Sequence, residues 1–238
     1  MPTPGARRTA VGRVARAVAA HEPGASRCSP GCTPTDTPGS TTWRRCWARR
    51  RRPFGATKRA VALAAAELVA PNMVVALSGG TTLTLLARML RGRSVNVVTN
   101  AVNVAAELYG ARATKVIVTG GALKLSGYEL VGAAAEPLIR AYHVDLLFCS
   151  CSGVDEAGFG RRDHAEAAVV KAFRRVAART VMLIDRGKLG RPYRARVASF
   201  DEVDRVLVDG PLDPAWRARL AAGGAEVVEV SPCQTGAP

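Results

Sequence analysis

The residues best suited to chemistry in this 238-residue chain form the string Ser78-Gly79-Gly80-Thr81-Thr82. Two glycines let a ligand approach the backbone closely, and three hydroxyl groups with the free N–H groups of a following helix suit a phosphate or another anion. The string lacks the Gly-Lys-Ser/Thr ending of a P-loop. A glycine turn followed by a Ser or Thr helix cap is the alternative interpretation, and the string alone does not separate the two.

Further polar residues follow other apolar runs of the sequence. Asn100 comes directly after one run, and by itself it would be interpreted as a helix cap. Gly153 and Asp155 follow another run, and the Asp155 carboxylate could accept hydrogen bonds from sugar hydroxyls. Lys188 is one of only five lysines, so its position after a run favours phosphate binding over a solvated surface role. Together these groups predict a pocket for a phosphorylated sugar or polyol.

The chain offers little for catalysis or for metal binding. His21, Cys28, Cys32 and Cys46 match no standard zinc spacing, so we expect no metal site and no other cofactor. No Ser–His–Asp set and no closely spaced His–carboxylate pair indicates hydrolysis. Glu166 opens a helix, where a carboxylate favours the helix dipole. We therefore expect a protein that is not an enzyme.

The elements that must position these residues alternate between strands and helices. Short runs that are apolar throughout predict buried strands, and stretches with helical spacing lie between them, which is the pattern of βαβ units. We expect an α/β fold with a mostly parallel twisted sheet and helices on both faces, in which the polar loops meet at the carboxyl ends of the strands. The predicted strands are 73–77, 95–99, 115–119, 145–150, 181–185, 205–209 and 226–230, and the predicted helices are 58–70, 81–91, 102–109, 129–142, 164–179 and 214–222.

Charge and composition divide the chain near residue 57. The net charge of +15 is uneven, because residues 1–57 hold eleven Arg and no Lys against two acids, which leaves +9 there. This segment also holds seven of the 14 prolines. We predict a basic Pro/Gly-rich segment at 1–57, a folded domain at 58–230 and a disordered tail at 231–238. The arginines suited to DNA contact are Arg44, Arg45, Arg49, Arg50, Arg51 and Arg52.

Several protein classes are excluded by what the sequence lacks. No stretch of about 18 uncharged apolar residues is present, so a transmembrane helix is not expected. Arg13 and Arg16 interrupt the one apolar stretch near the N-terminus, so no signal peptide is expected. The six cysteines are scattered and do not form a secreted disulfide framework. We expect a cytoplasmic protein.

From about residue 54 to 230 the residues resemble the C-terminal sensor domain of the DeoR family of bacterial transcriptional regulators. The order and spacing of several strings carry the resemblance over about three quarters of the chain. These strings are Lys58-Arg59-Ala60-Val61-Ala62, Ser78 to Thr82, Val97-Val98-Thr99-Asn100, Thr119-Gly120-Gly121, Tyr128-Glu129-Leu130-Val131-Gly132, Ser152-Gly153-Val154-Asp155, Glu166-Ala167 with Lys171, and Asp185-Arg186-Gly187-Lys188-Leu189-Gly190.

The resemblance implies a fold similar to the ribose-5-phosphate isomerase and glucosamine-6-phosphate deaminase group. It also implies a regulator, expected to be a repressor, that binds DNA, forms a homo-oligomer and responds to a phosphorylated sugar effector. Carried over position by position, it implies that the effector ligands are Ser78, Gly79, Gly80, Thr81, Thr82, Asn100, Gly153, Asp155, Lys171 and Lys188.

The N-terminal segment departs from the family pattern. The family begins with a winged helix-turn-helix of about 55 residues, in which one helix reads the major groove. Pro23, Pro30, Pro34 and Pro38 fall where its second and third helices would be, and prolines are incompatible with two packed helices. The segment therefore reads as a degenerate or disrupted DNA-binding region, and a frameshift over about residues 21–50 is one explanation. A sensor without specific DNA binding and a sugar-phosphate isomerase or deaminase are the alternative functions.

Overall fold

The computed structural model describes residues 55–231 of the chain. The predicted DNA-contacting arginines, Arg44 to Arg52, and almost all of the predicted tail lie outside the described residues. Among the residues described, no helix is both long and apolar enough to cross a membrane.

The core of the fold is a seven-stranded sheet in which every pair of neighbouring strands is parallel. Its strand order is β12-β11-β9-β6-β1-β2-β3. The strands are apolar along most of their length because helices cover both faces of the sheet. They are β1 (Val74–Leu77), β2 (Val95–Thr99), β3 (Thr114–Val118), β6 (Val144–Cys149), β9 (Ala177–Ile184), β11 (Arg205–Asp209) and β12 (Glu226–Val230).

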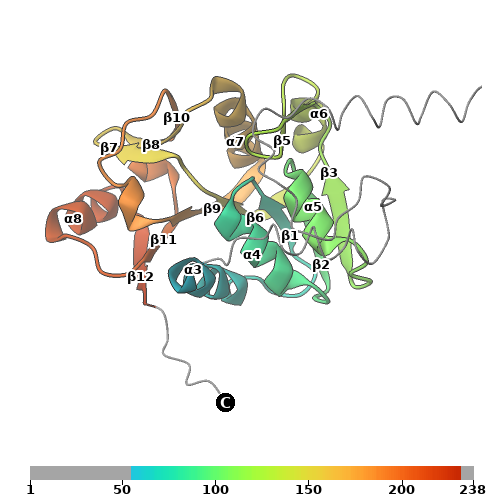
Figure 1. Cartoon of the computed structure of the whole chain (residues 1–238), viewed down its shortest axis with the longest axis horizontal. Coiled ribbons are helices and arrows are strands. Elements are labelled where there is room, and N and C mark those ends of the chain that lie inside the picture. Colours follow the sequence, from blue (N-terminus) through green and yellow to red (C-terminus); the bar gives the residue numbers. More distant parts are fainter. Residues whose placement is uncertain (1–54, 232–238) are drawn as a thin grey trace, which may run out of the picture. The chain divides into compact units, whose positions relative to one another are not determined.

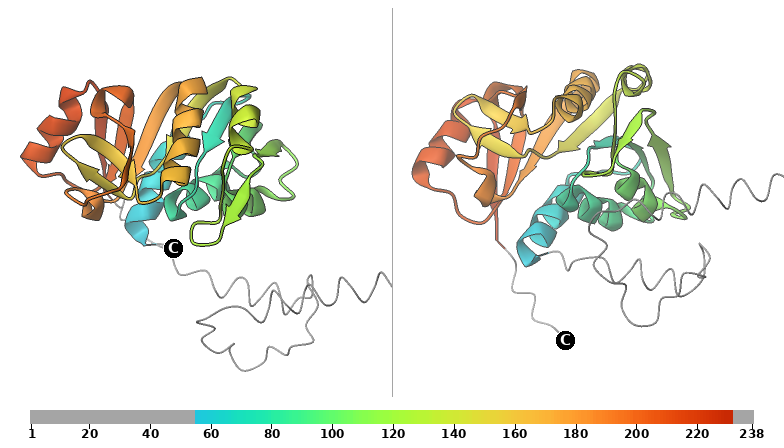
Figure 2. Two further views of the ribbon diagram at one scale, coloured as in Figure 1. Left: turned by 90° about the horizontal axis from the view of Figure 1, so that it is seen from above. Right: turned by 45° about the horizontal axis from the view of Figure 1, so that its top comes forward.

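Helices cover both faces of this sheet, as predicted (Figures 1 and 2). One face packs against α3 (Ala56–Glu67), α4 (Thr81–Leu90) and α5 (Val102–Leu108). The other packs against α6 (Ala135–Arg140), α7 (His164–Val176) and α8 (Pro214–Ala222). Side chains alternate between the two faces along each strand, so one strand contributes to two separate hydrophobic cores.

Two small antiparallel sheets, which the sequence pattern did not predict, join this α/β body. One is the hairpin of β4 (Ala122–Lys124) and β5 (Glu129–Val131). The other has the order β10-β8-β7, formed by β7 (Gly153–Asp155), β8 (Gly158–Arg161) and β10 (Ala195–Ala198). Two single-turn 3-10 helices, η1 (Arg186–Lys188) and η2 (Phe200–Glu202), complete the described elements.

Two of the predicted helices are partly wrong. The helix expected over 129–142 begins only at Ala135, because Glu129 to Val131 pair with β4 instead. The helix expected over 164–179 ends at Val176, because Ala177 is extended and pairs in register with Val144 of β6. In both places strand pairing determines the backbone conformation in spite of the local helix propensity.

The strand order reverses its direction between β1 and β6. From β1 the chain continues outward through β2 and β3, whereas β6, β9, β11 and β12 follow one another on the opposite side. The connections that leave β1 and β6 therefore diverge, so the carboxyl ends of these two strands are the switch point of the sheet, where ligands bind in folds of this kind. The Ser78–Thr82 string follows β1 directly, so it lies at this switch point.

Removal of a large side chain from one of the two cores tests the packing. Phe173 of α7 is fully buried, so we expect Phe173→Ala to lower the free energy of unfolding by about 3–5 kcal/mol through lost transfer energy and a residual cavity. Leu63→Ala on α3 is the control, since Leu63 is 53% exposed and should change stability by about 0.5 kcal/mol or less. Denaturant unfolding measures both, and equal effects would contradict the assigned packing.

Candidate effector site

The Ser78–Thr82 loop starts α4 without a side-chain cap. The N-cap is Gly80, whose φ of 138° is readily adopted by glycine, and no side chain accepts a hydrogen bond from the first turn. Ser78 is buried, and its N–H donates to the Phe148 carbonyl of β6 at 3.1 Å. The free N–H groups at this helix start therefore remain available to an anion, which favours the ligand interpretation of the loop over the capped turn.

Three cationic side chains from distant parts of the chain converge on this loop. Lys58 Nζ of α3 donates to Thr81 Oγ1 at 3.4 Å. Arg161 of β8 donates to Ser78 Oγ and to the Gly79 carbonyl, both at 3.3 Å. Lys188 Nζ of η1 donates to Ser150 Oγ at 2.9 Å, and Ser150 Cβ lies 3.9 Å from the position that a Cβ on Gly80 would take. Three cationic side chains thus lie around the loop, and one of them, Arg161, is paired with the Glu129 carboxylate.

The environment of Lys188 is unfavourable to its own charge. Burial lowers the pKa of the Lys188 ammonium, and repulsion from Arg161 and Lys58 lowers this pKa further, whereas Cys151 and Asp185 raise it. An anion bound at the loop would act in the opposite direction and stabilise the charged form.

A buried ion pair fixes the base of the site. Glu129 of β5 is 2% exposed, and its carboxylate accepts hydrogen bonds from Arg161 at 2.9 Å and from Asn100 Nδ2 at 3.2 Å. A Cβ on Gly79 would lie 2.3 Å from three side-chain atoms of Glu129, so no larger residue fits at that position. Glycine at position 79 is therefore required by the close approach of Glu129.

The ion pair extends into a wider charge network that holds the β4–β5 hairpin. Glu166 lies 3.5 Å from Arg161 and 2.8 Å from Lys124 of β4. Lys124 also contacts Asp163 at 2.7 Å, and Asp163 caps α7 by accepting from the Ala165 and Glu166 N–H groups. The hydrogen bond from Lys124 lowers the pKa of the Asp163 carboxyl. Glu166 therefore contributes to this network in addition to its position near the helix start.

The structure brings most, but not all, of the predicted ligands to one place. Asn100 is fully buried beside the ion pair, and its Oδ1 has no hydrogen-bond partner. Asp155 instead accepts from the Tyr193 hydroxyl at 2.8 Å and from the Ala157 N–H at 2.8 Å. Gly153 packs tightly against the backbone of Arg191. Lys171 lies half-buried on α7, and no contact links it to the loop within residues 55–231.

Four residues of the site were not identified as ligands from the sequence: Lys58, Glu129, Ser150 and Arg161. Arg161 and Glu129 belong to short antiparallel strands that have no readable periodicity. Lys58 begins a predicted helix, and only the topology shows that this helix starts beside the loop. Ser150 ends a predicted strand, and its hydroxyl could have been added by the same strand-end rule that selected Asn100.

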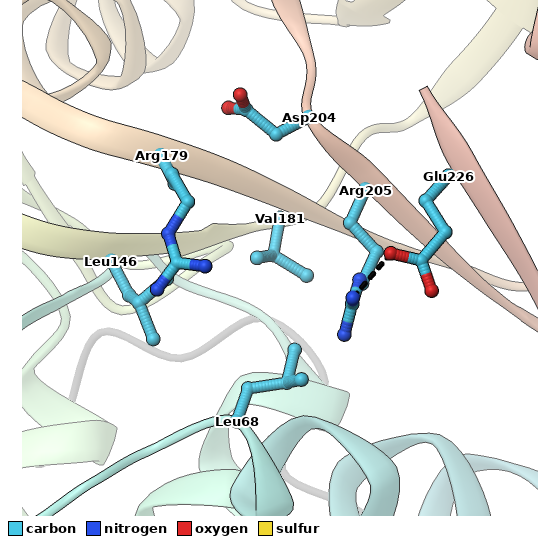
Figure 3. A pocket seen from close by; sticks show the side chains of 7 residues that line it. All are labelled: Leu68, Leu146, Arg179, Val181, Asp204, Arg205 and Glu226. Atoms are coloured by element: carbon cyan, nitrogen blue, oxygen red, sulfur yellow. Dashed lines mark hydrogen bonds and ion pairs between the residues drawn. The ribbon is translucent and has the colours of Figure 1, made fainter. Parts of the chain in front are cut away.

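A separate pocket lies at the other end of the strands, away from the Ser78–Thr82 loop (Figure 3). The beginnings of β9, β11 and β12 form it, so it is at the amino ends of the strands. Arg205 and Glu226 form an ion pair there, and none of the predicted ligands is part of it. Its lining residues are Leu68, Leu146, Arg179, Val181, Asp204, Arg205 and Glu226.

The described residues thus form a doubly wound α/β domain with a glycine-containing loop and an uncapped helix start at its switch point. Residues 55–210 match the family model described as the DeoR C terminal sensor domain. The chain belongs to the DeoR family of transcriptional regulators.

Curated relatives agree with this assignment. The HTH-type transcriptional regulator GlpR of Haloferax volcanii is 34% identical over 174 residues, which are 72% of this chain and 68% of that protein. The uncharacterized HTH-type transcriptional regulator YulB of Bacillus subtilis is 31% identical over 66% of this chain and 62% of its own length. The L-fucose operon activator of Escherichia coli is 30% identical over 65% of this chain and 64% of its own length. The match thus spans about two thirds of each relative.

Solved structures with a similar fold have lower sequence identity to this chain than the curated relatives. Ribose 5-phosphate isomerase A from Methanocaldococcus jannaschii is 20% identical with a TM-score of 0.42, over 56% of this chain and 53% of that chain. The tetrameric eIF2B-beta2-delta2 complex from Chaetomium thermophilum is 14% identical with a TM-score of 0.45, over 64% and 48%. Both likenesses concern the fold.

Neutralising Glu129 tests the buried ion pair. In Glu129→Gln the Arg161 guanidinium keeps its charge but loses its closer buried counter-charge, and Glu166 at 3.5 Å remains, so we expect the free energy of unfolding to fall by about 3 kcal/mol. Glu136→Gln is the matched control, because Glu136 pairs with Arg140 on the exposed side of α6 and should change stability by about 0.5 kcal/mol or less. Chemical denaturation compares the two variants, and a Glu129→Gln protein as stable as the control would refute the role of the pair.

Proposed function

We propose that this protein is a transcriptional regulator whose described domain binds a phosphorylated sugar, and that this binding changes its affinity for DNA. The phosphate is bound by the Ser78–Thr82 loop, by the first turn of α4 and by Lys188. The proposal implies a cytoplasmic protein that catalyses no reaction on its effector.

The single observation that supports this function most strongly is the cation-rich start of α4. An uncapped helix start supplies free N–H donors, and Arg161 and Lys188 supply positive charge at the same loop. Phosphate is a dianion with several acceptor oxygens, so it matches both the charge and the donors of this site. The hydroxyl groups of Ser78, Thr81 and Thr82 are further donors for the phosphate oxygens in this proposal.

The sugar part of the effector needs hydrogen-bond acceptors for its hydroxyls. Asn100 Oδ1 is a buried acceptor with no partner, and pairing it with a ligand hydroxyl would remove the cost of leaving it unsatisfied. We retain Gly153, Asp155 and Lys171 as proposed ligands, although Asp155 Oδ1 already accepts two hydrogen bonds. Their participation requires a rearrangement of these contacts when the effector binds.

DNA is the proposed second partner. The relatives are named as HTH-type regulators and as an operon activator, and the arginines proposed to contact DNA, Arg44 to Arg52, lie outside the described residues. We retain the proposal of a repressor. A homo-oligomer also stays a prediction, for which exposed Leu123, Leu125 and Tyr128 of the β4–β5 hairpin are suitable contact residues.

A thermal-shift screen tests effector binding. A ligand that binds only the folded state raises the melting temperature, so we expect some sugar phosphates to raise it and the corresponding unphosphorylated sugars not to. Lys188→Ala should weaken binding of the best ligand by about 1–3 kcal/mol, the range for a charged hydrogen bond.

The control for Lys188→Ala is Lys115→Ala on the exposed edge of β3, which removes the same charge elsewhere. Calorimetry should also show that affinity declines as the pH rises through the lowered pKa of Lys188, because only the ammonium attracts the phosphate. Unchanged affinity in Lys188→Ala would exclude Lys188 as a phosphate ligand.

Gel-shift titrations test the regulatory part of the proposal. We expect the full chain to prefer some promoter sequences over random DNA at physiological salt, and the effector to change the affinity for the preferred sequence. Equal affinity for all sequences, with a steep dependence on salt, would instead indicate a sensor whose arginines bind phosphates without reading bases.

A further inference from the structure

Lys58 stands at the point where the described domain begins. It is the third residue of α3, and residue 55 is the first residue that the structure describes. Its Nζ reaches across to Thr81 at the start of α4, 23 positions further along the chain. One flexible side chain thus connects the beginning of the domain with the loop that we propose to bind phosphate.

The charge of Lys58 is not explained by its local surroundings. α3 has no acidic residue in its first turn and no side-chain cap, and Lys58 and Arg59 place two positive charges there. Cations at a helix N-terminus are unfavourable because the N–H groups carry partial positive charge. The arrangement becomes favourable if an anion lies nearby.

The position of the Lys58 ammonium makes its electrostatic energy still less favourable. The Lys58 ammonium repels that of Lys188 and lowers its pKa. Lys58 contacts Thr81 at the uncapped start of α4, where the backbone N–H groups also carry partial positive charge. An anion bound at this helix start would compensate the charge of Lys58 and that of the N–H groups.

We propose that Lys58 is a direct ligand of the effector's anionic group, and that this contact couples occupancy of the loop to the N-terminal turn of α3. This inference rests on the proposed function of the loop, and it adds a residue and a route of regulation. Sugar phosphate and free phosphate share the anionic group that Lys58 would contact.

The two halves of α3 differ in how firmly they are held. Its buried residues begin at Val61 and continue through Ala62, Ala65 and Ala66, all packed in the core shared with α4. The residues before Lys58 are exposed or half-buried, and the Arg59 N–H to Gly55 carbonyl hydrogen bond is the first of the helix. The first turn is therefore the part whose stability a ligand contact can change.

Coupling of this kind is reciprocal. If an anion at the loop stabilises the first turn of α3, then anything that orders that turn raises the affinity of the loop for the anion by the same factor. The residues before α3 carry the proposed DNA contacts. The effector would thus act on DNA binding through the turn that joins the two regions.

The experiment compares the full chain with Lys58→Met and Lys58→Arg, using Arg59→Met as the matched control on the same turn. Inorganic phosphate is the probe, and its affinity is measured by calorimetry. Hydrogen exchange with mass spectrometry then follows the peptide 55–67 with and without phosphate. We expect Lys58→Met to weaken phosphate binding at least about fivefold and to abolish the phosphate-dependent protection of this peptide. Lys58→Arg should retain most of both effects, and Arg59→Met should resemble the wild type.

Three results are decisive against the proposal. If Lys58→Met binds phosphate as the wild type does, while Lys188→Ala does not, Lys58 is not a ligand and the proposed function of the loop stands. If Lys58→Met binds weakly but phosphate never protects residues 55–67 in the wild type, the coupling is refuted. If neither phosphate nor any sugar phosphate binds the wild type, the proposed function fails first and this inference fails with it.

Discussion

The buried ion pair between Arg161 and Glu129 is the interaction on which the geometry of the site depends. Glu129 comes from the β4–β5 hairpin and Arg161 from the β10-β8-β7 sheet, and they meet above the end of β1. A buried pair compensates its desolvation only when further hydrogen bonds satisfy the remaining donors and acceptors. Here Asn100, Ser78 Oγ and the Gly79 carbonyl provide three of these hydrogen bonds, whereas Arg161 Nε has no partner among the described residues. The pair thereby positions two small sheets relative to the loop.

The same pair leaves the loop with an excess of positive charge. Glu129 neutralises Arg161, whereas the hydrogen-bond partners of Lys58 and Lys188 within residues 55–231 are the hydroxyls of Thr81 and Ser150. Burial then makes the charge of Lys188 costly, as the direction of its pKa shift indicates. Desolvated charges of this kind are concentrated at functional sites. The Arg161–Glu129 pair is thus the rigid part of the site. The charges of Lys58 and Lys188 are the part that a bound anion would compensate.

The βαβ body could be predicted from the sequence, because each strand and each helix has its own local pattern. The strands over 95–99, 205–209 and 226–230 were predicted at their observed bounds, since short apolar runs that alternate with helical stretches indicate the strands of βαβ units. The Ser78–Thr82 loop could be identified by the same rule, because it follows a strand and precedes a helix. Lys188 was identified as a strand-end cation in the same way.

Residues that reach the site from outside the βαβ pattern could not be predicted in this way. Arg161 lies on a four-residue strand and Glu129 on a three-residue strand, both too short for a period of two to be recognised. Glu129 was even assigned to a helix, because Ala- and Leu-containing segments favour helix locally. Their contribution arises from contacts between residues 32 positions apart, which no local pattern contains.

The position of α3 follows from topology. A helix that leads into a strand of a parallel sheet must run opposite to that strand, so the start of α3 lies at the edge where β1 ends. The contact between Lys58 and Thr81 agrees with this direction. The carboxyl edge is also where ligands bind in such sheets. The first turn of α3 therefore lies beside the Ser78–Thr82 loop, which is the geometry that the proposed contact of Lys58 with an anion requires.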